Sequence, residues 1–74
     1  MEVVMPKLGL TMEEATLIGW LVADGERVSV GQPICEIETD KATEELEAEA
    51  DGMLRHAVAV DETVAAGTVI AYIE

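Results

Sequence analysis

The feature of this chain that most constrains its fold is an internal repeat. A shift of 36 residues aligns Asp24–Glu38 with Val60–Glu74 without a gap, and six of the fifteen aligned positions are identical. Gly25 falls opposite Asp61, which fits a turn with positive φ because aspartate tolerates that conformation better than most residues. Two repeats are too few for a solenoid, so they predict two similar halves of a sheet structure related by a pseudo-two-fold axis.

Short apolar runs between turn signals predict β-strands in both halves of the chain. In the first half these runs cover residues 2–5, 15–22, 27–30 and 34–38, and residues 7–14 are expected to form a loop. Gly19 interrupts the second run and predicts a bulge or a close approach of two backbones. Its counterpart in the second half is expected to be Gly52, at a shift of 33.

The stretch from residue 36 to residue 51 contains eight carboxylates and a single cation, Lys41. Residues 40–51 are rich in helix-forming residues, begin with possible N-cap residues and end at Gly52, which favours a helix. The same residues alternate between small or apolar side chains at even positions and polar ones at odd positions, with Glu44 as the exception, which favours a strand. Local pattern leaves both possibilities open.

Composition excludes several classes of function. With 74 residues and no phenylalanine, the chain predicts one small domain with a thin aliphatic core, too small for an enclosed active site. The formal charge of −12 argues against nucleic-acid binding and fits docking onto a basic partner. No apolar run is long enough to span a membrane, and the cytoplasm or another reducing compartment is the expected location.

Three unusual side chains are expected to be structural. Cys35 is the only cysteine, so it cannot form an internal disulfide, and we expect a small buried or half-buried filler. His56 has no metal-ligand spacing around it and is expected to be a surface or strand residue. Trp20 is expected to pack in the core or at its rim.

The segment Glu38-Thr-Asp-Lys-Ala42 resembles the attachment turn of lipoyl domains, the carrier domains of 2-oxo acid dehydrogenase complexes. The resemblance extends over the whole chain, since further matching segments follow in the family's order and spacing. These are Met5–Gly9, Thr11–Glu14, Gly19-Trp20, Asp24–Val28, Gly31, Ile34–Ile37, Gly52 and Val64–Gly67. Two positions depart from the family pattern: Ala15 stands where many members have glycine, and Asp61 where glycine is frequent.

The resemblance implies an all-β fold for residues 1–74: a flattened β-barrel, or barrel-sandwich hybrid, of two four-stranded antiparallel sheets with pseudo-two-fold symmetry. Residues 42–50 would then be a strand, with Lys41 at the tip of a hairpin. Lys41 would carry lipoic acid in amide linkage, flanked by Asp40 and Ala42. Further residues are candidates for recognition by partner enzymes: Leu8, Leu10, Thr11, Met12, Glu13, Glu38 and Thr39.

The implied protein is a non-catalytic, monomeric carrier domain, part of a dihydrolipoamide acyltransferase chain or free-standing. Its expected partners are a lipoate ligase or lipoyl transferase, a 2-oxo acid decarboxylase or dehydrogenase, the acyltransferase core and dihydrolipoamide dehydrogenase. The expected location is the bacterial cytoplasm, or the mitochondrial matrix in a eukaryote. Gly9-Leu-Thr-Met12 resembles the pyruvate, acetoin or branched-chain type more than the 2-oxoglutarate type.

Two alternative functions share this fold. A biotin carrier also uses a hairpin lysine, but such carriers typically place methionine on both sides of it, where this chain has Asp40 and Ala42. An unmodified adaptor domain of the same barrel type would not need an intact lysine motif.

Overall fold

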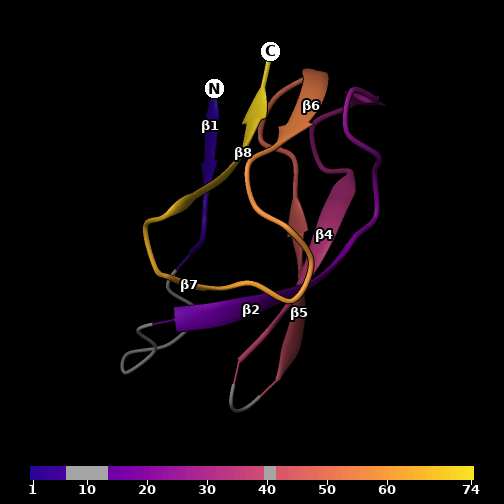
Figure 1. Cartoon of the computed structure of the whole chain (residues 1–74). Helices are drawn as coiled ribbons and strands as arrows, with labels where there is room; N and C mark the ends of the chain where they lie inside the picture. The colour runs from indigo at the N-terminus through magenta and orange to yellow at the C-terminus, as the bar shows by residue number, and fades with distance from the viewer. Residues whose placement is uncertain (7–13, 40–41) are drawn as a thin grey trace.

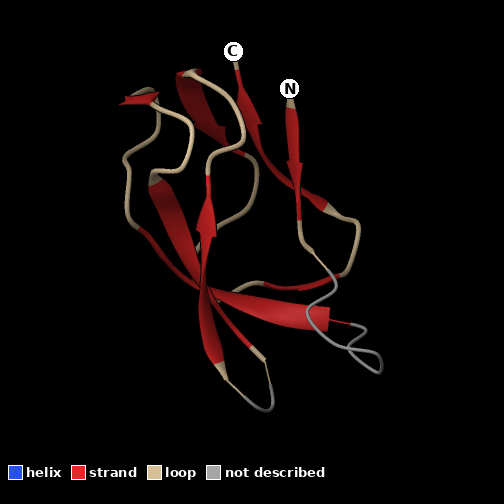
Figure 2. Ribbon diagram, turned by 180° about the vertical axis from the view of Figure 1, so that it is seen from behind, coloured by secondary structure: helices blue, strands red, loops and turns tan. Residues whose placement is uncertain are grey.

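The computed structural model describes residues 1–6, 14–39 and 42–74, and every regular element in them is a β-strand. The strands are β1 (Glu2–Val4), β2 (Glu14–Trp20), β3 (Arg27–Val28), β4 (Pro33–Glu38), β5 (Thr43–Glu47), β6 (Gly52–His56), β7 (Thr63–Ala65) and β8 (Val69–Ile73). They form two four-stranded antiparallel sheets, in the orders β1-β8-β6-β3 and β5-β4-β2-β7 (Figures 1 and 2). The predicted all-β fold of two sheets is confirmed. Nowhere in the described part does the chain form an apolar helix long enough to cross a membrane.

The pseudo-two-fold relates strands that belong to different sheets. It exchanges β1 with β5, β2 with β6, β3 with β7 and β4 with β8, because each strand holds the same place in its sheet as its partner does in the other. Each half of the chain, β1–β4 or β5–β8, therefore contributes two strands to each sheet, and neither half forms a complete sheet by itself. The two halves depend on one another to bury their apolar faces.

The turns of the two repeats confirm the predicted equivalence. Asp61 has φ of 73° where Gly25 has 85°, so aspartate occupies the left-handed turn position as expected. Equivalent backbone hydrogen bonds also recur. The Gly31 N–H donates to the Ala48 carbonyl at 2.8 Å, as the Gly67 N–H does to Met5 at 2.7 Å.

The predicted equivalence of Gly19 and Gly52 is wrong, although the bulge at Gly19 is confirmed. The pairing of β2 with β4 shifts register between Leu17 and Gly19. This bulge adds one residue to β2, so positions before it correspond to β6 at a shift of 37. Gly52 lies opposite Val28 as Ala15 lies opposite Val64, which makes Ala15 the counterpart of Gly52. No single offset could align both sides of the bulge.

An aromatic pair joins the two halves at symmetry-equivalent positions. Trp20 ends β2 and His56 ends β6, and their rings stack with centroids 3.8 Å apart and planes 7° from parallel. Trp20 Nε1 donates to the Val58 carbonyl at 3.2 Å, while His56 Nε2 lies 2.9 Å from the Val22 carbonyl, which requires a proton on Nε2. Both interactions are related by the same shift of 36 residues, so the two-fold axis passes close to this stack.

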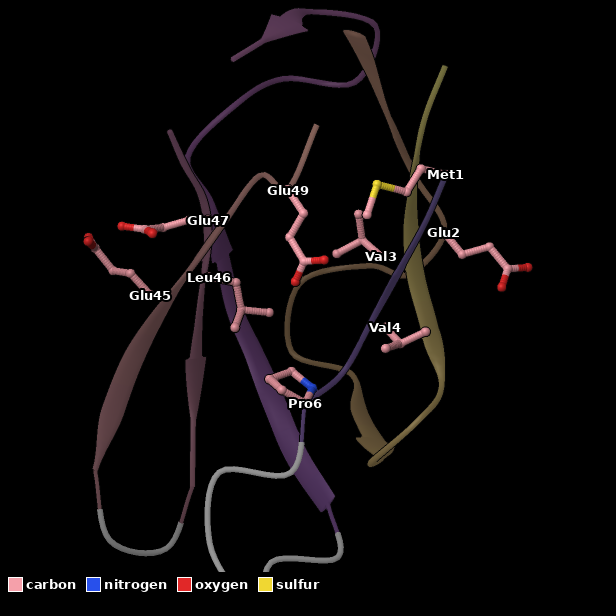
Figure 3. A pocket seen from close by; sticks show the side chains of 9 residues that line it. All are labelled: Met1, Glu2, Val3, Val4, Pro6, Glu45, Leu46, Glu47 and Glu49. Atoms are coloured by element: carbon pink, nitrogen blue, oxygen red, sulfur yellow. The ribbon is translucent and has the colours of Figure 1, made fainter. Parts of the chain in front are cut away.

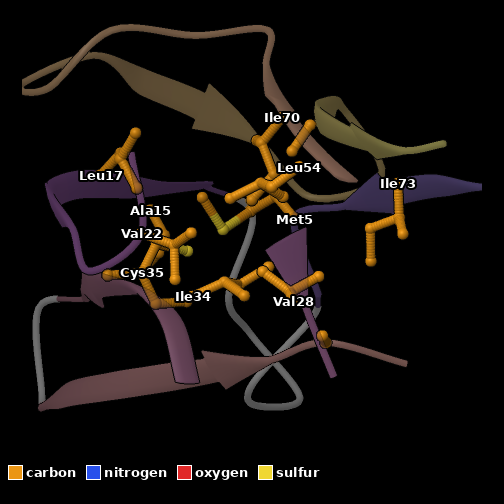
Figure 4. Close-up of a cluster of buried hydrophobic side chains, with 13 residues drawn as sticks. Met5, Ala15, Leu17, Val22, Val28, Ile34, Cys35, Leu54, Ile70 and Ile73 are labelled. Atoms are coloured by element: carbon orange, nitrogen blue, oxygen red, sulfur yellow. The ribbon is translucent and has the colours of Figure 1, made fainter. Parts of the chain in front are cut away.

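The core between the sheets is almost entirely aliphatic, and no buried polar side chain occurs among the described residues. Its buried members are Met5, Ala15, Leu17, Val22, Val28, Ile34, Cys35, Ile37, Ala48, Leu54, Ile70, Ala71 and Ile73 (Figure 4). Cys35 is fully buried, as predicted, and burial raises the pKa of its thiol from 9.0 to about 12.

Tertiary pairing decides the ambiguous segment in favour of a strand. Residues 43–47 form β5 at the edge of their sheet, paired with β4, and no helix forms in residues 42–51. Leu46 is half-buried and Ala48 is buried, whereas Glu45, Glu47 and Glu49 are exposed, so the alternation was the correct signal. The strand is shorter than the predicted 42–50 because the chain bends at residues 49–51.

Replacing Gly52 by alanine tests the close approach of β6 to the end of β8. A Cβ at this position would lie 2.5 Å from the Glu74 carbonyl oxygen and 2.7 Å from Ile73 Cγ2. We expect Gly52→Ala to lower the free energy of unfolding by about 2 kcal/mol or more, because backbone must move to relieve the overlap. Urea unfolding followed by tryptophan fluorescence measures this change.

Gly19→Ala is the matched control, since a Cβ there meets no atom within 4 Å. We expect Gly19→Ala to lower the free energy of unfolding by less than about 1 kcal/mol. Equal losses in the two variants would contradict the assigned packing of Gly52.

A thiol reagent tests the burial of Cys35. The folded domain is expected to react with a disulfide reagent about 1000-fold or more slowly than the chain in denaturant, because reaction requires an opening that costs about 4 kcal/mol or more. The raised pKa acts in the same direction, since it keeps the thiol protonated at neutral pH. Rapid labelling of the folded domain would contradict this packing.

Candidate functional site

The hairpin of β4 and β5 is closed by Thr39 and Ala42, the residues on either side of the Asp40-Lys41 pair. The Thr39 N–H donates to the Ala42 carbonyl at 2.9 Å. The Thr39 hydroxyl donates to the same carbonyl and accepts from the Ala42 N–H, each at 3.1 Å. Asp40 and Lys41 themselves lie outside the described residues. Three hydrogen bonds thus hold Thr39 and Ala42 together, and Asp40 and Lys41 connect these two residues in the sequence.

The stem of the hairpin is anchored in the core. β4 is a central strand of its sheet, with β5 on one side and β2 on the other. Ile34, Cys35 and Ile37 of β4 are fully buried, whereas Glu38 and Ala42 are exposed. The hairpin therefore has a rigid base and a solvent-exposed end. The described end of the hairpin lies on the side of the molecule opposite the chain termini (Figure 1).

A row of side chains crosses the sheet next to the turn of the hairpin. Glu38 pairs with Thr43 of β5 on one side and with Thr16 of β2 on the other. Thr16 in turn pairs with Thr63 of β7, and their hydroxyls lie 2.8 Å apart. Glu38 is the one residue of this row that the sequence predicted as a site residue, because strand register cannot be read from a single sequence.

Negative charge surrounds the described part of the hairpin. Glu36 and Glu45 are directly opposite each other in the β4–β5 ladder, an arrangement that places like charges side by side. The ion pairs of the described residues both involve Arg55, on the other sheet, which contacts Asp24 and Glu74. The carboxylates of the hairpin are therefore not neutralised by described cations, and they favour a positive charge nearby.

The structure brings together three of the predicted site residues: Glu38, Thr39 and Ala42. Thr39 shapes the turn through its hydroxyl, which gives it a structural role besides the predicted one in recognition. The other predicted residues lie outside the described part of the chain: Leu8, Leu10, Thr11, Met12, Glu13, Asp40 and Lys41. The segment 7–13 leads into β2 at Glu14, two residues before Thr16 in the row beside the hairpin.

The described side chains do not assemble a metal site, since no group of three or more His, Cys, Asp or Glu residues among them could hold an ion. The described residues instead form the fixed base of a hairpin turn, with exposed residues beside it and carboxylates around it. Such a turn can present one flexible side chain to the active site of another protein.

Comparison with known proteins identifies the family. A model of the biotin/lipoyl family, described as "Biotin-requiring enzyme", matches residues 1–73. The mouse mitochondrial pyruvate dehydrogenase protein X component is 51% identical over 53 residues, which cover 72% of this chain and 11% of that protein. An Arabidopsis thaliana mitochondrial protein, dihydrolipoyllysine-residue acetyltransferase component 3 of the pyruvate dehydrogenase complex, is 40% identical over 72 residues, which cover 95% and 13%.

A bacterial relative comes from Cupriavidus necator. It is the dihydrolipoyllysine-residue acetyltransferase component of an acetoin cleaving system, 49% identical over 57 residues, which cover 77% of this chain and 15% of that protein. The chain thus spans less than a fifth of the length of these relatives.

The structural comparison agrees with the sequence relatives. The solution structure of the lipoyl domain of the 2-oxoglutarate dehydrogenase complex from Azotobacter vinelandii superimposes with a TM-score of 0.80 and 28% identity, over 99% of this chain and 94% of that one. The fold and the sequence relatives agree. The chain therefore belongs to the biotin/lipoyl attachment family and is a lipoyl domain, a non-catalytic carrier domain.

Proposed function

We propose that Lys41 carries lipoic acid in amide linkage to Nζ and serves as a swinging arm in a 2-oxo acid dehydrogenase complex. The observation that supports this most directly is the closure of the β4–β5 hairpin by hydrogen bonds between Thr39 and Ala42, the two residues that flank Asp40 and Lys41 in the sequence. A lysine amine is protonated at neutral pH and is therefore a poor nucleophile, so attachment requires an enzyme that removes the proton.

The residues of the hairpin that flank Asp40 and Lys41 are compatible with an attached lipoyl group. An amide to lysine needs an amine with room around it, and the residues flanking the turn, Glu38 and Ala42, are exposed. Bound lipoic acid supplies disulfide–dithiol chemistry and a thiol that can carry an acyl group. The protein contributes position: the buried part of β4 fixes the base from which the arm extends. Tethering in a larger assembly would give the arm an effective concentration of about millimolar at each active site.

We propose a complex of the pyruvate, acetoin or branched-chain type. The Gly9–Met12 segment supports this assignment, and so do relatives named for pyruvate dehydrogenase and acetoin cleavage. The proposed partners are a lipoate ligase or lipoyl transferase, the 2-oxo acid decarboxylase, the acyltransferase core and dihydrolipoamide dehydrogenase. The proposed location is the bacterial cytoplasm, or the mitochondrial matrix in a eukaryote.

Intact mass after incubation with a lipoate ligase, lipoic acid and ATP tests the attachment. We expect one lipoyl adduct per chain, lost in Lys41→Ala and kept in Lys7→Ala, the matched control at the other lysine. An adduct that persists in Lys41→Ala would overturn the assignment. A parallel incubation with a biotin ligase and biotin tests the alternative carrier function, and a biotin adduct on Lys41 would establish it in place of the lipoyl one.

The hydroxyl of Thr39 is expected to matter for modification more than for stability. Thr39→Val keeps the shape of the side chain but removes both of its hydrogen bonds to Ala42. We expect unfolding free energy to fall by about 1 kcal/mol or less, because the site is exposed. The rate of lipoylation at low domain concentration should fall by about threefold to tenfold, because the turn is presented less often in the required conformation.

Thr43→Val is the matched control for that measurement, since it makes the same chemical change on the same hairpin at the exposed start of β5. We expect its lipoylation rate to stay within about twofold of the original. Equal slowing of both variants would show that turn closure is not what the ligase depends on.

A further inference from the structure

A groove opens on the side of the molecule where the two sheets leave their edges free. Its volume is about 250 Å³, and it lies between β1 and β5, each the terminal strand of its sheet (Figure 3). Edge strands present backbone N–H and C=O groups on the side that lacks a neighbour, so they can accept a further extended chain. The groove is therefore bordered by two open edges.

The groove has its own symmetry, because the pseudo-two-fold exchanges β1 with β5. Met5 and Ala48 form equivalent backbone hydrogen bonds with Thr68 and Gln32, at 2.8 and 2.9 Å. Counting back from this pair makes Val3 equivalent to Leu46.

Apolar side chains form the floor of the groove. Val3 and Leu46 are half-buried and pack against the core from the two sides. In Figure 3 both point into the space between the strands, and Pro6 lies below them. The floor is thus apolar and held in place by the core.

Acidic side chains form the rim. Glu49 extends from the β5 side into the space between Leu46 and Val3, while Glu2 and Glu45 lie on the outer sides of the two strands (Figure 3). None of these glutamates is in an ion pair with a described residue. An apolar floor with an uncompensated acidic rim is complementary to a chain that alternates apolar and basic residues.

We propose that this groove docks an extended segment of a partner protein in which apolar residues alternate with lysine or arginine. Alternate side chains of an extended strand point to opposite sides, so the apolar ones can contact Val3 and Leu46 while the basic ones reach Glu2 and Glu45 on the outer sides of the strands. A basic residue at the end of the segment can pair with Glu49 in the groove. A second copy of this chain is a poor occupant, because it would bring its own acidic rim against this one at a net charge of −12.

The proposed docking is separate from the attachment function. The groove begins at Glu45, beyond the Thr39–Ala42 turn, and involves neither residue of that turn. A partner seated here can hold the domain by its side while the end of the hairpin stays accessible. The test uses the unlipoylated domain, so its outcome does not depend on the proposed role of Lys41.

An alternating heptapeptide of lysine and valine, beginning and ending with lysine, serves as the probe. Titration into the isotopically labelled domain should shift backbone amide resonances of β1, β5 and residues 48–50, with weaker effects elsewhere. We expect Glu49→Lys to weaken binding by about tenfold, because a repulsive charge replaces an attractive one in the groove. Shifts spread evenly over the outer sheet faces, or an absence of binding, would overturn the proposal.

Glu62→Lys is the matched control, with the same change in charge at an exposed glutamate before β7. It should weaken binding by no more than about twofold. Equal weakening in the two variants would show that the peptide binds only through net charge. Leu46→Thr tests the floor in the same titration, and a loss of about threefold or more is expected. Circular dichroism shows whether each variant remains folded. If Leu46→Thr does not fold, the result for Glu49→Lys alone tests the proposed docking.

Discussion

The aliphatic core shared by the two repeats is the constraint on which the rest of this structure depends. Ile34 and Ile37 of β4 and their equivalents Ile70 and Ile73 of β8 are buried at the centre of opposite sheets. A fully buried isoleucine contributes about 2 kcal/mol through removal from water, and none of these residues would be covered by its own repeat alone. The fold is therefore cooperative across the repeats, although each repeat has the same local turns and strands.

The same core explains how a small acidic domain can present one turn with a defined geometry. Burial of Ile37 fixes β4 up to the position before Glu38, and the hydrogen bonds between Thr39 and Ala42 complete the hairpin. The carboxylates lie on the outer face, where water screens the repulsion between Glu36 and Glu45. The inner faces of the strands thus hold the apolar residues that stabilise the fold, and the outer faces hold the charged residues. The surface can therefore be strongly acidic without destabilising the core.

The repeat predicted much of this architecture from sequence, because matching turns impose matching backbone conformations. The positive φ of Asp61 followed from its alignment with Gly25. Strand β5 did not follow from local propensity, since pairing with β4 overrode a helix-favouring composition. The equivalence of Ala15 and Gly52 was missed because the bulge before Gly19 changes the offset within one strand. Strand register cannot be read from one sequence. The threonine row beside Glu38 and the partners of His56 could therefore not be predicted, because both depend on register.

The stack of Trp20 on His56 has a practical consequence. Trp20 is the only tryptophan of the chain, and its ring contacts a residue from the other repeat. Its near-ultraviolet absorption and emission are therefore expected to report on whether the two halves are docked. The tryptophan signal thus monitors the contact between the two halves close to the pseudo-two-fold axis.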